Sequence, residues 1–103
     1  MTWSVSTDEG VLVARFDGHL SEKEGELSAR AFVRELQTAG IIDVAFDVRA
    51  MTGYDRGARV ARQRELYPVR DCILTLEVRG GNSMVRMGAS VMALALGIEM
   101  RVV

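Results

Sequence analysis

Three arginines recur at a spacing that could bring their side chains together. Arg56, Arg59 and Arg62 follow one another at intervals of three residues in a segment, 55–66, that we expect to be helical. Residues three apart on a helix are neighbours, so these side chains would form a positive stripe. Guanidinium groups make planar, bidentate contacts with carboxylates and phosphates. The stripe therefore indicates either a contact surface for an acidic or phosphorylated partner, or an ordinary solvated helix face.

A glycine-containing turn offers a second place for chemistry. Its candidate anion-binding residues are Arg79, Gly80, Gly81 and Ser83, between an expected strand and an expected helix. Free backbone N–H groups at the start of a helix can hold an anion. The segment lacks the G-x-G-x-x-G spacing and the P-loop lysine of nucleotide sites. It therefore predicts either an anion site or a plain turn in which Asn82 or Ser83 caps the helix.

Metal binding and nucleophilic catalysis have little support. His19 and Cys72 are the only histidine and the only cysteine, whereas zinc sites normally need three or four protein ligands. No nucleophile–base pair can be read from the sequence. We therefore expect no metal, no cofactor and no catalytic residue, and predict that the protein is not an enzyme.

Alternating and helical patterns place these residues on the elements of an α/β fold. Ser21 with Glu24 three residues later is a capping box that begins a helix, and Gly40 suits its end. We expect Asp55 to cap the next helix in the same way. The inner face of the first helix would carry Leu27, Ala31, Phe32, Leu36 and Ala39. The expected strands are 3–6, 11–16, 41–48, 72–78 and 98–103, and the later helices are 55–66 and 83–96.

The order of these elements is β-β-α-β-α-β-α-β. It predicts one α/β domain, residues 1–103, with a mixed sheet of about five strands and helices packed on the sheet. The opening hairpin is antiparallel. Right-handed strand–helix–strand crossovers should make the last three strands parallel neighbours. The mostly apolar run 41–48 is typical of a strand covered on both faces.

The third helix is apolar around most of its circumference. Such a helix is either deeply buried or meets a partner, and methionine suits adaptable interfaces. We therefore predict an oligomer or partner interface at Met84, Met87 and Val91, with core packing as the alternative. The apolar stretch 84–96 is interrupted by Arg86 and is too short to span a bilayer, so no membrane insertion is expected.

Charge and the first residues narrow the class further. The net charge is −1, and few aromatic residues accompany the arginines, so we predict no nucleic-acid partner. Residues 1–47 carry a net −5 and residues 48–103 a net +4. Residues 1–10 contain no basic residue followed by an apolar run, so no secretory signal is expected and a cytoplasmic location is predicted.

The segment 47–55, D-V-R-A-M-T-G-Y-D, resembles the signature of the STAS domain (sulfate transporter and anti-sigma-factor antagonist), D-L-S-x-V-x-x-I-D-S-S-G. Asp47, Val48, Met51, Tyr54 and Asp55 fall at the spacing of that family. The ending, A-L-A-L-G over 93–97 followed by a short apolar strand, is also similar. The resemblance in element order covers nearly the whole chain.

The resemblance implies a regulatory or scaffolding domain of bacterial signalling. Its partner would be an anti-sigma-factor kinase or a signalling assembly. In the family, the serine directly after the motif aspartate is phosphorylated; here Arg56 stands at that position, so the usual switch is missing. Thr52 is then either a substitute phosphosite or a turn residue. The implied partner-binding residues are Thr52, Tyr54, Asp55, Arg56, Arg59 and Arg62.

A second hypothesis belongs to another class of function. The same fold could bind a small molecule or a lipid, with the methionine-rich third helix lining an apolar pocket. Arg79 and the Gly80-Gly81 turn would then hold an anionic head group.

Overall fold

The computed structural model describes residues 2–103, with side chains from Trp3 onward. Within that range the elements follow the predicted order, which confirms the α/β fold. They are β1 (Thr2–Asp8), β2 (Val11–Leu20), α1 (Glu22–Ala39), β3 (Ile42–Tyr54), α2 (Arg56–Leu66), the 3-10 helix η1 (Tyr67–Cys72), β4 (Ile73–Arg79), α3 (Ser83–Leu96) and β5 (Met100–Val102).

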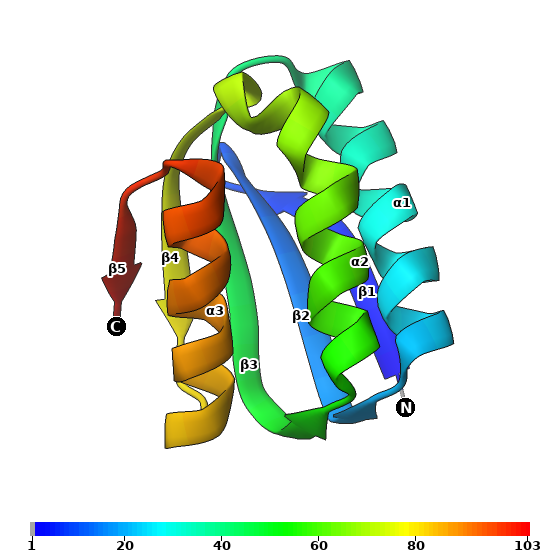
Figure 1. The fold of residues 1–103 in the computed structure, drawn as a ribbon. Helices are drawn as coiled ribbons and strands as arrows, with labels where there is room; N and C mark the ends of the chain where they lie inside the picture. The colour runs from blue at the N-terminus through cyan, green and yellow to red at the C-terminus, as the bar shows by residue number, and fades with distance from the viewer. Residues whose placement is uncertain (1) are drawn as a thin grey trace.

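The strand order across the sheet is β1-β2-β3-β4-β5, the same as the order along the chain. β1 is antiparallel to β2, and β2 through β5 are parallel. Each right-handed crossover therefore moves the sheet one strand further in the same direction, which puts every crossover helix on the same face. Figure 1 shows this arrangement, with α1, α2 and α3 side by side in front of the sheet.

The core lies between this helical layer and the sheet. Alternate residues of the strands face the helices, as in the sequence Val44, Phe46 and Val48 of β3. Phe32 and Leu36 of α1 are fully buried against them, and the Phe32 and Phe46 rings meet edge to face with centroids 5.7 Å apart. This packing fixes the positions of the residues at the carboxyl ends of β2 and β3 relative to the helices.

The predicted inner face of α1 is partly wrong. Leu27 is 43% exposed and Ala39 is exposed, while Gly25, Ser28 and Ala29 are buried with Phe32 and Leu36. Leu27 lies roughly 140° round the helix from Phe32, and Ala39 is the last helical residue. Small residues are buried instead because α1 faces α2 as well as the sheet.

The face of the sheet opposite the helices carries charged pairs. Asp47 of β3 accepts hydrogen bonds from Arg49 Nε (2.9 Å) and Arg15 Nε (3.0 Å). Glu77 accepts from Arg79 Nε (2.6 Å) and Arg101 Nη2 (3.1 Å). The hydrogen bond from Arg49, with that from Arg15, holds the pKa of Asp47 well below its usual range.

β3 runs to Tyr54, beyond the predicted end at 48. The prediction of a strand covered on both faces over 41–48 holds for 44–48, whereas Ile41 and Asp43 are exposed. No helix covers the second face within residues 2–103. On that face the Asp47 side chain is paired with Arg15 of β2 and Arg49 of β3 itself. Among the helices described, none combines the length and the apolar character needed to cross a bilayer.

Candidate functional site

Several predicted site residues gather where β2 and β3 end. Parallel pairing puts His19 opposite Gly53 and Leu20 opposite Tyr54. Each strand leads almost directly into a helix, α1 after β2 and α2 after β3. The carboxyl ends of parallel strands are a frequent place for binding sites in α/β sheets.

Asp55 joins the starts of the two helices. Its backbone N–H donates to the Leu20 carbonyl (2.8 Å), its Oδ2 accepts from the Glu22 backbone N–H (3.2 Å), and its Oδ1 lies 2.8 Å from His19 Nε2. The hydrogen bond with His19, followed by that from the Glu22 N–H, lowers the pKa of Asp55 from its ordinary value.

The prediction that the Asp55 side chain caps α2 is therefore wrong. Asp55 occupies the N-cap position of α2, but its side chain makes no hydrogen bond to that helix. The β2–β3 pairing brings the first turn of α1 within reach, so the carboxylate satisfies a free N–H group of α1 instead. Ser21 Oγ accepts from Glu24 N–H in the same turn (3.2 Å), which is one of the two hydrogen bonds of the predicted capping box. The Glu24 carboxylate accepts from Trp3 Nε1 (2.7 Å).

Arg56 and Thr52 are exposed beside this junction. The Arg56 side chain has no hydrogen bond or ion pair with any other residue of the described chain. The Thr52 carbonyl accepts from Asn82 Nδ2 (3.2 Å), which joins the end of β3 to the start of α3. Tyr54 extends the junction, with its hydroxyl donating to the Met84 carbonyl (3.4 Å).

The predicted stripe of three exposed arginines is wrong at Arg62. Arg56 is exposed and Arg59 is half-buried, but Arg62 is only 5% exposed. Its Nη2 donates to Ser28 Oγ of α1 (2.7 Å), and its guanidinium carbon lies 4.7 Å from the Phe16 ring centroid. Intervals of three fall short of the 3.6-residue turn, so each step rotates the side chain further round α2 and the third faces inward.

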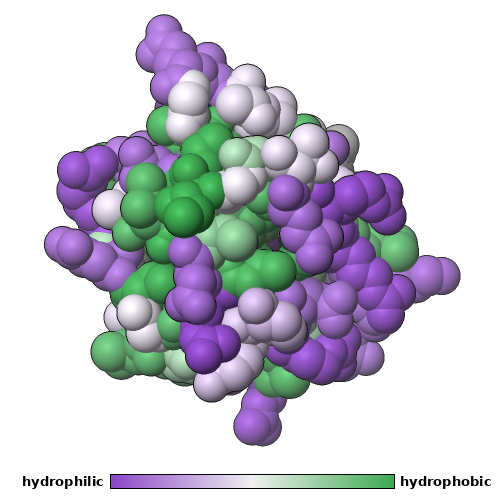
Figure 2. Space-filling view, turned by 90° about the horizontal axis from the view of Figure 1, so that it is seen from above, coloured by the Kyte–Doolittle hydropathy of each residue, from purple (hydrophilic) through white to green (hydrophobic). Residues whose placement is uncertain are grey.

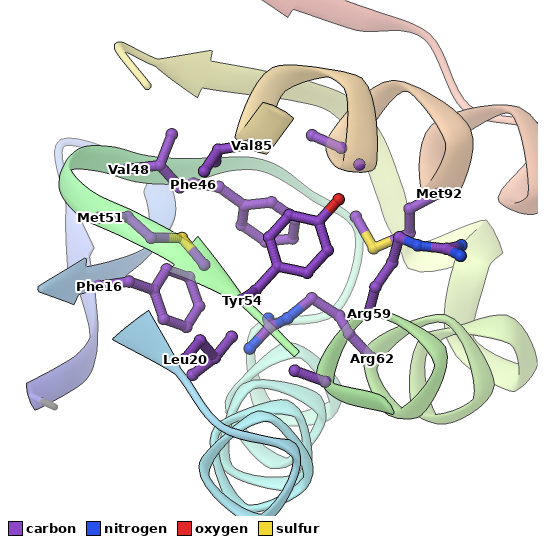
Figure 3. A pocket seen from close by; sticks show the side chains of 13 residues that line it. Phe16, Leu20, Phe46, Val48, Met51, Tyr54, Arg59, Arg62, Val85 and Met92 are labelled. Carbon is purple, nitrogen blue, oxygen red and sulfur yellow. The ribbon is translucent and has the colours of Figure 1, made fainter. Parts of the chain in front are cut away.

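A pocket of about 60 Å³ lies between α2, α3 and the ends of β2 and β3. Its wall is formed largely by apolar side chains, and Arg59 and Arg62 of α2 contribute to it (Figure 3). Burial lowers the pKa of Arg62 to about 10. Val85 and Met92 of α3 line the pocket, as the small-molecule hypothesis expected of that helix. Arg79, which that hypothesis placed at the anionic head group, does not line this pocket.

The glycine turn has its polar groups engaged within the chain. Arg79 Nε donates to Glu77 Oε2, and the Gly80 N–H donates to the Val103 carbonyl (3.1 Å). Asn82, rather than Ser83, caps α3 through its side chain, which accepts from the Val85 N–H (3.0 Å). Gly80 and Gly81 have φ values of 73° and 93°, which favour glycine. An anion site at Arg79, Gly80, Gly81 and Ser83 stays a prediction.

One face of α3 is apolar and exposed. Met84, Met87, Val91 and Leu94 are 62%, 66%, 44% and 80% exposed. Their spacing of three, four and three residues matches the a and d positions of a heptad. The first three are the residues predicted as an interface. Leu94 was missed, although continuing the same spacing by three residues would have found it.

Hydrophobic side chains also gather at one end of the molecule. Figure 2 looks onto the end where α1, α2 and α3 finish, and shows a connected hydrophobic area bordered by hydrophilic side chains. Three exposed apolar residues are close in sequence to this end of the molecule. They are Ile41 after α1, Leu74 at the start of β4 and Leu94 near the end of α3.

Sequence reasoning missed three contributors to these sites: His19, Glu22 and Ser28. Their contacts with Asp55 and Arg62 span 33 to 36 residues, so no local pattern reports them. In the part of the chain that the structure describes, no group of three or more histidine, cysteine or acidic side chains could hold a metal ion.

The fold is similar to solved structures. An uncharacterised DUF3478-family protein with a SpoIIAA-like fold from Shewanella loihica PV-4 has a TM-score of 0.71 at 14% identity, covering 99% of this chain and 84% of that one. The anti-sigma factor antagonist SpoIIAA in its unphosphorylated form has a TM-score of 0.63 at 16% identity, with coverages of 96% and 86%. The Bacillus cell fate determinant SpoIIAA in its phosphorylated form has 0.65 at 17%, with coverages of 99% and 91%.

These likenesses confirm the STAS-like fold that the 47–55 motif predicted. No family model matches the sequence, and no curated protein matches it.

Proposed function

We propose that residues 1–103 form one cytoplasmic, non-catalytic domain of bacterial signalling that regulates or scaffolds by binding a protein partner. The partner is an anti-sigma-factor kinase or a signalling assembly. The contact area is the β3–α2 surface, which we define as Thr52, Asp55, Arg56 and Arg59, with Tyr54 holding the end of β3 in place. SpoIIAA, which shares the fold, is an anti-sigma factor antagonist.

The observation that carries this proposal is the state of Arg56. It is the first residue of α2, exposed, and without an acidic partner in residues 2–103. In the family that the motif resembles, a serine that can be phosphorylated stands there. A phosphoserine carries about −1.5 to −2 charges, whereas arginine is always positive. The surface therefore fits an acidic group on the partner and does not respond to phosphorylation at this position.

Catalysis has no constellation of side chains to carry it. His19 and Asp55 form the one histidine–carboxylate pair of the described residues. Across those same residues, no serine, threonine or cysteine side chain forms a hydrogen bond with His19, so the pair has no nucleophile to activate.

The α3 face supports a second contact. We propose that Met84, Met87, Val91 and Leu94 pair with the same face of a second copy. The residues beside the seam, Ser83, Ser90 and Ala95, are small and uncharged, so two copies can approach closely without repulsion between like charges. The proteins that bind the β3–α2 surface would then meet a dimer.

The test of the β3–α2 surface is capture of proteins from lysate on immobilised protein. Arg56→Glu reverses the charge without touching the pocket, because Arg56 does not line it. Arg34→Glu on α1 is a matched control, since Arg34 is also exposed and helical. We expect one signalling protein to be retained by the wild type and by Arg34→Glu and lost with Arg56→Glu and with the double variant Arg56→Glu, Arg59→Glu. Equal retention by all four would refute the surface assignment.

A further inference from the structure

We propose that the pocket between α2 and α3 binds a small monocarboxylate with a short apolar chain, with its carboxylate held by Arg62. This is a ligand site in addition to the protein-binding surface, and it does not depend on that proposal.

Arg62 carries a buried positive charge. The residue is 5% exposed, and its Nη1 group is buried with no hydrogen-bond acceptor among residues 2–103. Nη2 donates to Ser28 Oγ, a neutral group. No carboxylate of the described chain lies within ion-pair distance of this guanidinium. A buried charge normally has an opposite charge or a full set of hydrogen bonds, because desolvation costs several kcal/mol.

The pocket lies directly beside this guanidinium. Arg62 is one of the residues that line the pocket. Figure 3 shows its guanidinium group directed toward the side chains of Phe16, Leu20 and Tyr54. The volume of about 60 Å³ is several times the roughly 10–15 Å³ that one water needs. That is enough for a carboxylate with a few carbon atoms attached.

The pocket combines a guanidinium with an apolar wall, and this combination selects the ligand. A guanidinium and a carboxylate match in shape and charge, and the pair is strongest where water is excluded. The other wall of the pocket consists of apolar groups such as Phe46, Val85 and Met92, which suit a hydrocarbon chain. An inorganic phosphate has no apolar group to place against that wall, and burying it there would cost the hydration of its remaining oxygens.

Arg59 supports the same assignment. It precedes Arg62 by three residues on α2, lines the same pocket, and is half-buried. Within residues 2–103 it has no ion pair. Two cations without acidic partners thus border one apolar pocket, and both favour the approach of an anion.

The test uses sodium butyrate as the probe and calorimetry with NMR titration as the readouts. We expect saturable binding of butyrate to the wild-type protein, with shifts confined to the pocket residues. Butyramide has the same shape without the charge, and should bind at least about tenfold more weakly because it cannot pair with a buried guanidinium. Inorganic phosphate should not bind at the pocket.

Three variants separate the roles of charge and space. Arg62→Met removes the charge and keeps much of the volume, and Ala89→Leu fills the pocket while leaving Arg62 in place. Each should weaken butyrate binding about tenfold or more. Arg64→Met removes an exposed arginine of the same helix and should bind butyrate as the wild type does.

The proposal is overturned by any of three results: no saturable binding of butyrate to the folded wild type, butyramide or phosphate binding as tightly as butyrate, or unchanged affinity in folded Ala89→Leu and Arg62→Met. Because Ala89 is half-buried on α3 and far in sequence from Arg62, a failure of one variant to fold leaves the other to decide.

Discussion

Gly25 of α1 and Ala58 of α2 lie against each other where the two helices pack. A Cβ atom placed on Gly25 would lie 2.5 Å from Ala58 Cβ and 2.6 Å from Ala58 Cα. Only a residue without a side chain allows this approach. The same closeness lets Arg62 reach Ser28 across the helical layer (2.7 Å). The pocket and the junction at Asp55 therefore depend on how tightly α1 and α2 pack.

Gly25→Ala should destabilise the protein by about 1–3 kcal/mol, because the added methyl group meets backbone and forces the helices apart. Alanine has a helix propensity roughly 1 kcal/mol better than that of glycine, but this gain should be smaller than the loss caused by the steric clash. Urea unfolding measures it as a lower midpoint with an unchanged slope. Gly57→Ala is the matched control. Its methyl group would meet only the flexible side chain of Glu22, so its midpoint should stay the same or rise, and an equal loss in both variants would argue against the close contact.

Arg62→Met should leave the free energy of unfolding within about 1 kcal/mol of the wild type, or raise it. Stacking on Phe16 and Phe46 and the bond to Ser28 are worth about 2 kcal/mol each, but burial of the charge costs several. Arg62→Ala should lose roughly 2–5 kcal/mol, since it leaves a cavity. Chemical denaturation of the three proteins compares them. A large loss in Arg62→Met would mean that the charge itself stabilises the fold.

Asp55→Asn should remove a pH-dependent part of the stability. The pKa of Asp55 is lowered in the folded protein from 3.8, so the folded state releases this proton more readily than the unfolded state. The contribution is therefore complete above about pH 5 and is lost as the pH falls through the unfolded and then the folded pKa. Urea midpoints of the wild type and Asp55→Asn are measured at about pH 6.5 and about pH 3, on either side of this titration. We expect the wild type to exceed Asp55→Asn by more at the higher pH. A gap between the two proteins that is the same at both pH values would contradict it.

Leu94→Lys and Met87→Lys should convert a dimer into a monomer. Each places a charge within the proposed α3 seam, where it would be buried against the second copy. Sedimentation velocity over a concentration series measures the mass. Arg86→Lys on the same helix keeps the charge and is the control. A wild type that stays monomeric at every concentration would rule out the α3 pairing.

The sequence allowed the fold to be predicted because its signals are local. Ser21 and Glu24 mark the start of α1, Gly97 in the left-handed conformation ends α3, and the mostly apolar segment 11–16 predicted the strand β2. These elements and their crossovers predicted β3, β4 and β5 as parallel neighbours, which is how they lie. The motif 47–55 then predicted a STAS-like fold, which the structural comparisons confirm.

The candidate sites could be predicted only in part. The face of α3 was visible as a pattern, but the positions of Arg62 and Asp55 were not. Which way Arg62 points depends on the rotation of α2 against α1, and the hydrogen bond from the Glu22 N–H to Asp55 depends on the pairing of β2 with β3. Both are contacts between residues more than 30 apart, which no local period encodes.

The agreement between strand order and chain order has a consequence for synthesis. Each strand pairs with the one made just before it, so a chain leaving the ribosome never waits for a later strand to be inserted between two earlier ones. The hairpin of β1 and β2 can accept α1 and β3 at once, and every further step repeats that addition at the growing edge. Assembly can therefore keep pace with translation, and the pocket is completed only once α3 has been made.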